Sequence, residues 1–128
     1  MSKEAVRTEA APAPFQGAPY SQAIKAGGFV FVSAQLGLEP GGKELVDGGV
    51  AAQTEQIFAN LRAILEAAGS SLDKLVKTTV YLQHLDDFAA MNDVYKKHVG
   101  DTPPARATVE VASLPSGSLV EIEAIAVV

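Results

Sequence analysis

The side chain best suited to chemistry in this sequence is Arg106, which follows a double proline in the segment Pro-Pro-Ala-Arg-Ala-Thr-Val-Glu that starts at Pro103. An arginine stays charged at any working pH, and its planar fork of donors matches a carboxylate or a phosphate group. The plainer role of a strand arginine is a weak ion pair at the surface. Arg106 is therefore a candidate anion-binding group, with a surface ion pair as the alternative.

Two glutamates are the second unusual feature, because Glu121 and Glu123 interrupt the otherwise apolar stretch 120–127. Carboxylates are seldom buried without a partner. They either face water at the edge of a sheet or supply a proton acceptor beside the arginine. In a tight hairpin, the face that carries them would meet the face that carries Arg106 and Thr108.

Alternation along residues 105–112 sorts the neighbours of the arginine onto two faces of a strand. We expect the apolar set to face the core, so that the guanidinium heads a polar face. The polar set is Arg106, Thr108 and Glu110, and the apolar set is Ala105, Ala107, Val109 and Val111.

Composition limits the other kinds of site. The 128 residues fit one domain, 1–128, and ten basic against fifteen acidic residues give a net charge of -5. We therefore expect no nucleic-acid backbone binding and no anionic membrane surface as partner. The sequence has no cysteine, and its two histidines, His84 and His98, lie far apart, so we predict no metal site. Without a leader-like start or a long apolar run, a cytoplasmic protein is the expectation.

The first half of the chain reads as a hairpin followed by a long helix. Residues 29–33 form a β-branched and aromatic run after Gly27-Gly28, with residues 23–24 as the hairpin partner. A helix is expected to begin near Asp47 or the glycines after it and to end at Gly69. Its apolar positions share one face: Val50, Ile57, Leu61, Ile64, Leu65 and Ala68.

The second half reads as strand, helix, strand, strand. Residues 75–82 fit a buried strand, and Asp86 or Asp87 caps a helix. Strands 105–112 and 118–127 are joined by a Pro-Ser-Gly turn, which favours a hairpin. One face of the strand is expected to carry Val76, Thr78, Val80 and Leu82. The helix is expected to bury Phe88, Met91, Tyr95 and His98.

This order predicts an α+β fold with one mixed sheet and both helices on one face. The other face would then be uncovered. Because the strands are rich in alanine, valine and isoleucine, an open face would expose more apolar area than a monomer tolerates, which favours self-association.

Six segments, spread over almost the whole chain, resemble the RidA/YjgF family of enamine/imine deaminases. They are Gly17–Ala23, Val32–Gln35, Val76–Leu82, Asp87–Tyr95, Pro104–Val111 and Val120–Ala126.

The resemblance implies a homotrimer in the chorismate-mutase-like fold, with clefts between subunits. It implies hydrolysis of 2-iminobutanoate and 2-iminopropanoate to 2-oxo acids and ammonia, without a cofactor. It places the carboxylate-binding group at Arg106 and the water-positioning group at Glu121. The other positions that it assigns to the cleft are Tyr20, Ser33, Ala34, Asn92 and Thr108.

Two positions depart from the family pattern. Ala34 stands where the family commonly has glycine, and Thr108 stands where many members have cysteine. The resemblance implies that backbone groups act at both places, so the reaction type is expected to persist. A methyl group at Ala34 would either narrow the cleft or oppose a glycine-only backbone angle.

The sequence leaves other functions open. A regulatory trimer of the same family could bind small carboxylates at Arg106 without turning them over, and ammonia release would separate the two. RNA cleavage is also reported for the family, but the acidic balance argues against it. A chorismate mutase would need several cations in its site, and the sequence offers one.

Overall fold

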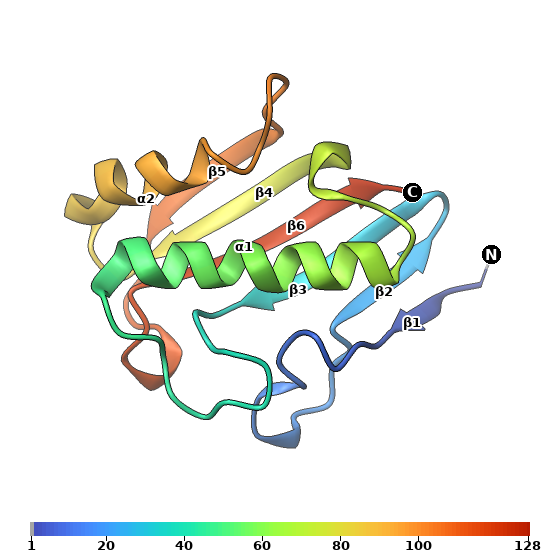
Figure 1. The fold of residues 1–128 in the computed structure, drawn as a ribbon, viewed down its shortest axis with the longest axis horizontal. Coiled ribbons are helices and arrows are strands. Elements are labelled where there is room, and N and C mark those ends of the chain that lie inside the picture. The colour runs from blue at the N-terminus through green and yellow to red at the C-terminus, as the bar shows by residue number, and fades with distance from the viewer. Residues whose placement is uncertain (1) are drawn as a thin grey trace.

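The computed structural model describes residues 2–128, which form one mixed six-stranded sheet with two helices on one face (Figure 1). Across the sheet the strand order is β1-β2-β3-β6-β4-β5. The helices are α1 (Gly49–Ala67) and α2 (Phe88–Tyr95). The strands are β1 (Glu4–Val6), β2 (Ala23–Ala26), β3 (Phe29–Gln35), β4 (Leu75–Leu82), β5 (Ala105–Glu110) and β6 (Val120–Val127). The fold class predicted from the sequence is confirmed, and β1 is a strand that the sequence analysis did not predict.

Strand direction follows from the connections. The pair β2–β3 is an antiparallel hairpin whose turn residues, Gly27 and Gly28, have φ of 60° and 84°. Two positive φ values in a two-residue turn match the twist of a hairpin. The chain passes from β4 through α2 to β5, and this crossover makes β4 and β5 a parallel pair.

The predicted hairpin of the last two strands does not form. Strand β4 lies between β5 and β6, and it pairs with β5 in parallel and with β6 antiparallel. The Pro115–Gly117 turn is a short 3-10 helix that carries the chain past β4. Since β6 also pairs with β3, Glu121 and Glu123 lie on an inner strand, and the alternative that placed them at a sheet edge is wrong.

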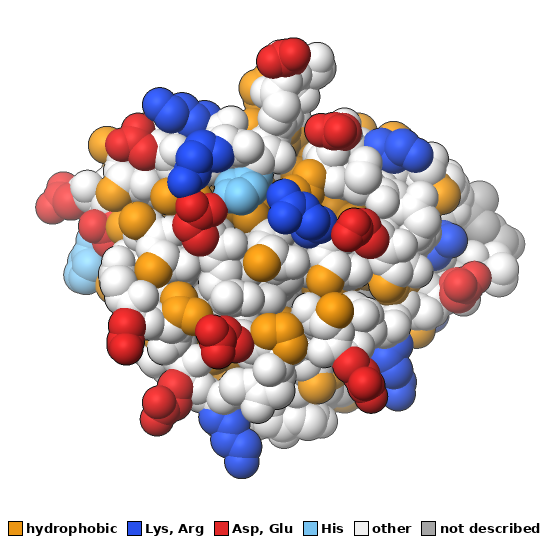
Figure 2. Space-filling view, viewed as in Figure 1, with side chains coloured by type: hydrophobic (Ala, Val, Ile, Leu, Met, Phe, Trp, Pro, Cys, Tyr) orange, Lys and Arg blue, Asp and Glu red, His pale blue; other side chains and the backbone are white. Residues whose placement is uncertain are grey.

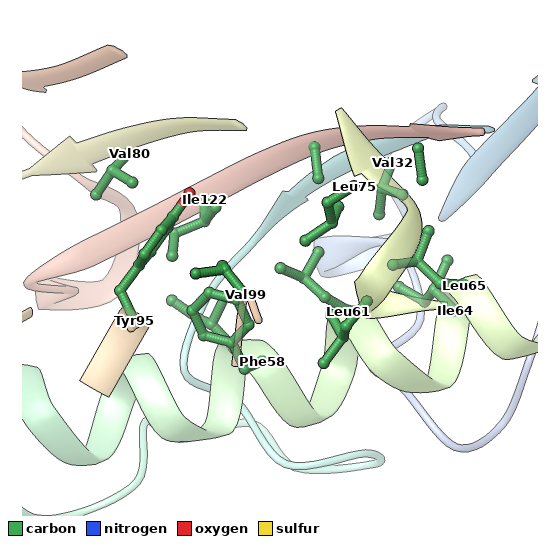
Figure 3. Close-up of a cluster of buried hydrophobic side chains, with 14 of the residues drawn as sticks. Val32, Phe58, Leu61, Ile64, Leu65, Leu75, Val80, Tyr95, Val99 and Ile122 are labelled. Carbon is green, nitrogen blue, oxygen red and sulfur yellow. The ribbon is translucent and has the colours of Figure 1, made fainter. Parts of the chain in front are cut away.

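Helix α1 packs its predicted apolar face against the sheet. Glycines bound it, with φ of 114° at Gly48 and 80° at Gly69. Phe58, which the predicted stripe omitted, is also fully buried. Figure 3 shows Phe58, Leu61, Ile64 and Leu65 directed from α1 toward residues of the sheet. Each such side chain stabilises the fold by about 1.5–3 kcal/mol through burial.

Strand β4 departs from simple alternation at its start. The register against β6 shifts between Leu75 and Lys77, and Val76 is left 40% exposed. Leu75 is buried in its place, whereas Thr78, Val80 and Leu82 are buried as predicted. A bulge adds one residue to a strand and thereby reverses the faces on either side of it, so the expected position of Val76 is wrong.

The apolar stripe of α2 divides into two parts. Met91 and Tyr95 are buried, and the Tyr95 hydroxyl lies 2.6 Å from Thr78 Oγ1 of β4. His98, just past the helix, stacks its ring on Phe58 with centroids 4.7 Å apart. Phe88 is exposed instead of buried. The stripe therefore joins α2 to the core only through its second half.

The face of the sheet opposite the helices is open in this chain. Phe29 and Phe31 are 40% and 44% exposed there, and their ring centroids lie 6.2 Å apart. Val109 is exposed as well. The predicted apolar open face is thus present. Among residues 2–128, no helix combines the length and the hydropathy needed to cross a membrane.

Candidate functional site

Arg106 faces the helices, contrary to the expectation that the apolar side of its strand would do so. Its neighbour across the β4–β5 pair is Thr78, which is fully buried under α2. Paired residues share a face, so Arg106 and Thr108 lie on the helix side. The alternate residues Ala105, Ala107 and Val109 are exposed on the open side. The open sheet face takes the apolar set because α2 offers polar and aromatic groups at this edge.

Helix α2 builds a binding surface for the guanidinium. Arg106 Nη1 donates a hydrogen bond to Asn92 Oδ1 at 2.8 Å. The guanidinium carbon lies 4.7 Å from the ring centroid of Tyr95 and 5.5 Å from that of Phe88. Aromatic faces attract a cation and fix the plane of the fork. Within residues 2–128 no carboxylate forms a salt bridge with Arg106, so its charge is free for an anionic ligand.

Thr108 adds an unsatisfied hydroxyl to the same face. Its Oγ1 is the buried side-chain oxygen that lacks a hydrogen-bond partner within the part of the chain that the structure describes. An unpaired buried hydroxyl costs about 1–3 kcal/mol. Within residues 2–128, the Thr108 hydroxyl therefore forms no hydrogen bond that could stabilise the fold.

Replacing Thr108 with valine is expected to leave the melting temperature unchanged or to raise it. Valine keeps the shape of threonine and removes the unpaired oxygen. Thr108→Ser is the matched control, because it keeps the hydroxyl, loses a methyl group and should melt earlier. A clear drop in melting temperature for Thr108→Val alone, measured by differential scanning calorimetry, would show that the hydroxyl has a partner in solution.

The other predicted site residues meet in a separate cavity of about 500 Å³. Its size suits a small organic ligand. Arg106 does not line it. The predicted residues that do are Tyr20, Ser33, Ala34 and Glu121, and Glu123, Phe15, Gln35 and Pro115 join them.

Backbone contacts hold the wall of this cavity. Ser33 donates through Oγ to the Ser21 carbonyl at 2.7 Å and through its backbone N–H to the Gln22 carbonyl at 2.9 Å. The Tyr20 hydroxyl accepts the Phe15 backbone N–H at 2.6 Å. Ala34 has no positive φ, so the glycine-only angle is not required here. Its methyl group can act only by occupying space in the cavity.

Gln22 fixes the chain segment before β2, which lines the same cavity. It is buried, and its side-chain amide accepts the Thr8 N–H at 2.7 Å. The same amide donates to the carbonyls of Thr8 and Pro12 at 3.0 and 2.8 Å. A side chain that forms hydrogen bonds with several backbone groups at once holds their segment in place, and Gln22 is in this sense a clamp on the segment.

Gln22→Met is expected to lower the free energy of unfolding by at least about 2 kcal/mol, because methionine fills the space but leaves buried backbone groups unpaired. Urea unfolding followed by circular dichroism measures this. Proteolysis within residues 8–20 should accelerate in the same variant. An unchanged urea midpoint together with unchanged proteolysis would refute the clamp.

Glu121 is the partly buried acid of the cavity. Burial raises the pKa of Glu121, and the charge of Glu123, two residues along the same strand, raises it further. A carboxyl group with a raised pKa is better matched to proton transfer near neutral pH. Glu121 is therefore suited to take and return a proton.

Arg106 and Glu121 lie on opposite faces of the sheet. On β4, Thr78 pairs with Arg106 and Tyr81 pairs with Glu121. Residues three apart on a strand point to opposite sides. The neighbour of Glu121 on β6, Ile122, is fully buried under the helices. The predicted meeting of the two side chains within one hairpin is wrong, and in one chain the guanidinium and the acid lie apart.

The structure adds residues that the sequence analysis did not assign to the site. Phe88 and Tyr95 read as core residues of a helix, yet they flank the guanidinium. Their spacing of seven, with Asn92 between them, puts all three on one helix face. Phe15 and Pro115 come from distant loops, and no local pattern signals them.

Comparison with known proteins gives the family. The model of the family described as endoribonuclease L-PSP matches residues 8–128. A RutC family protein of Pyrococcus abyssi is 51% identical over 126 residues, which are 98% of each chain. The 2-iminobutanoate/2-iminopropanoate deaminase of Mus musculus is 45% identical over 98% of this chain and 91% of that protein.

A solved structure agrees. The crystal structure of RidA from an Antarctic Psychrobacter superposes with a TM-score of 0.92 at 46% identity, covering 98% of this chain and 99% of that chain. Matches of this extent and identity, with the same fold, show common descent. The chain belongs to the RidA/YjgF family, the family described as endoribonuclease L-PSP.

Proposed function

We propose that this protein hydrolyses 2-imino acids such as 2-iminobutanoate and 2-iminopropanoate to 2-oxo acids and ammonia. The observation that carries the proposal is the pair of half-sites, a guanidinium without a carboxylate partner and a partly buried acid in a cavity. The guanidinium suits the carboxylate of an imino acid, and the acid suits the water that attacks its imine carbon. The named activity of the mouse relative supports the same reaction.

Arg106 binds the substrate carboxylate in this proposal. Its fork is held by Asn92 and by the faces of Phe88 and Tyr95, so little side-chain freedom is lost on binding. A charge-assisted hydrogen bond of this kind stabilises a complex by about 1.5–3 kcal/mol. By holding the carboxylate, Arg106 orients the imine carbon of the substrate toward the acid of the other half-site.

Glu121 moves the protons. The substrate reacts as its protonated form, the iminium. The carboxylate removes a proton from water as the water oxygen bonds to the iminium carbon, and the C=N electron pair moves to nitrogen, which becomes neutral. The resulting carbinolamine takes that proton on nitrogen, and the C–N bond then breaks. The hydroxyl proton leaves with ammonia as ammonium, and Glu121 ends ionised as it began. The protein supplies orientation and proton transfer, and the iminium carbon is already electrophilic.

Complete sites require two copies of the chain, since the half-sites lie on opposite sheet faces. We infer a homotrimer in which the open face is covered and each cleft takes Arg106 from one subunit and Glu121 from another. The exposed apolar side chains Phe29, Phe31 and Val109 support such an assembly.

Mixing two inactive variants tests the shared site. Arg106→Ala and Glu121→Gln are unfolded together, refolded at equal ratio and assayed for ammonia from freshly generated 2-iminobutanoate. Clefts between subunits should restore about one quarter of the wild-type activity, because one cleft in four then has both side chains. Each variant refolded alone is the control. No recovery from mixed trimers would refute the shared site.

Ammonia release also distinguishes an imine-hydrolysing enzyme from a regulatory protein that only binds small carboxylates. A regulatory module that only binds small carboxylates would take up 2-oxobutanoate and leave the imine to decay at its uncatalysed rate.

The family description names an endoribonuclease, but basic and acidic side chains alternate over the face in Figure 2 without a continuous basic patch. With a net charge of -5, phosphate-backbone binding has little electrostatic support.

A further inference from the structure

The cavity holds a second carboxylate that the proposed reaction does not use. Glu123 lies on the same face of β6 as Glu121, and both line the 500 Å³ cavity. Tyr81 of β4 lies directly across from Glu121 in the strand register, yet its hydroxyl donates to Glu123 Oε1. The phenol thus selects one of the two acids.

We propose that Tyr81 and Glu123 are positioning residues for Glu121: the tyrosine holds Glu123 as a fixed carboxylate, whose charge keeps on Glu121 the proton taken from water. This inference rests on the proposed hydrolysis. It names the groups that set how strongly Glu121, the acid of that reaction, holds a proton. Neither Tyr81 nor Glu123 needs to touch the substrate.

The contacts support a division of roles between the acids. A phenol donates its proton in a hydrogen bond to a carboxylate most strongly when that carboxylate is ionised. The hydrogen bond to Glu123, together with burial, raises the pKa of Tyr81, so the tyrosine keeps its proton and stays a donor. Two acids in one cavity cannot ionise independently, because each charge disfavours the other. Glu123, and not Glu121, accepts the hydrogen bond of the Tyr81 hydroxyl.

In a single chain, the lining of the cavity around Glu121 offers no cation to offset this charge within residues 2–128. Lys77, on the same face of β4 as Tyr81, pairs with Ile125 outside the lining, and the Arg106 of the proposed cleft comes from another subunit. From its own strand Glu123 faces it, from β4 Tyr81 faces it, and from the segment before β2 Tyr20 lines the same cavity. Strand β3 contributes Ser33, Ala34 and Gln35, which are uncharged. Within residues 2–128 no lysine, arginine or histidine lines the cavity. A negative cavity also favours the cationic iminium form of the substrate.

The test is the pH profile of kcat/KM for imine hydrolysis. Glu123→Gln keeps the size of the side chain and removes its charge, so the acidic limb should move to lower pH. Tyr81→Phe should move the limb in the wild-type background and leave it in place in the Glu123→Gln background, because the tyrosine acts through Glu123. Glu66→Gln, an exposed acid on α1, is the matched control and should keep the wild-type profile.

A second measurement needs no turnover. In protein labelled with ¹³C at the glutamate carboxyl carbon, the resonance of Glu121 is identified by its loss in Glu121→Gln and titrated without substrate. Glu123→Gln should lower the titration midpoint of that resonance. A structural role for Glu123 would change melting temperature or KM but would not move this midpoint.

The two measurements separate the possible failures. A wild-type protein that releases no ammonia, with a Glu121 midpoint that moves in Glu123→Gln, would refute the proposed hydrolysis and keep the coupling. Normal turnover with an unmoved limb and an unmoved midpoint would overturn the positioning role. A Tyr81→Phe shift of equal size in both backgrounds would remove the tyrosine from the proposal.

Discussion

Arg106→Ala is expected to lower kcat/KM for 2-iminobutanoate hydrolysis by about a hundredfold or more, because two charge-assisted hydrogen bonds to the substrate carboxylate are lost together. In the described part of the chain, the guanidinium donates a side-chain hydrogen bond to Asn92 at 2.8 Å. Its removal should therefore change little in the fold. The measurement couples a threonine dehydratase to the protein and times the release of 2-oxobutanoate and ammonia.

Arg106→Lys is the informative control, since it keeps the charge and loses the planar fork. A lysine cannot bind a carboxylate in the bidentate manner or stack between Phe88 and Tyr95 in the same way. It should recover only part of the activity. Sedimentation of both variants should show the same assembly as the wild type. Full activity in Arg106→Ala would exclude the arginine from the mechanism.

Glu121→Gln should mainly reduce kcat, by about 10² to 10⁴, the contribution of a positioned proton-transfer group. Glutamine keeps the volume of the side chain in the cavity but cannot accept the proton of the attacking water. Binding of a non-reactive analogue such as a 2-oxo acid should be almost unchanged, because the arginine holds its carboxylate. Calorimetric titration measures that affinity, and stopped-flow absorbance of the imine measures turnover.

Equal losses of turnover and of analogue binding in Glu121→Gln would assign the glutamate a structural role. In the wild type, the activity that depends on Glu121 should fall as the acid becomes protonated. Since burial and Glu123 raise the pKa of Glu121, this fall should begin at a higher pH than for an ordinary glutamate. The base is present above that pKa and absent below it.

Much of the fold could be predicted from local patterns. The 3.6-residue spacing of Ile57, Leu61 and Ile64 determines the buried face of α1, and Gly27-Gly28 determines the β2–β3 turn. Bulges and strand order could not be predicted in this way. The extra residue at Val76 has no local signature, and the strand paired with β6 is decided by contacts between segments far apart in the sequence.

The candidate site likewise has features that could be predicted from the sequence and features that could not. Residue types indicated Arg106 as a candidate anion-binding group and Glu121 as an unusual acid. The face on which each side chain lies was not predictable, because a strand's two faces are assigned only when the helices cover one of them. Alternation alone put the apolar residues Ala105 and Ala107 in the core, and the structure puts them on the open side.

The sequence by itself determined both helices, the strands β2 to β6, the family resemblance and the chemical groups, because these depend on side-chain type and on spacing along the chain. Only the tertiary structure decided that the guanidinium and the acid stand on opposite sides of one sheet. It also decided that Tyr81 reaches Glu123. These facts depend on which strands become neighbours, and that is set by burial of the whole core and not by any one segment.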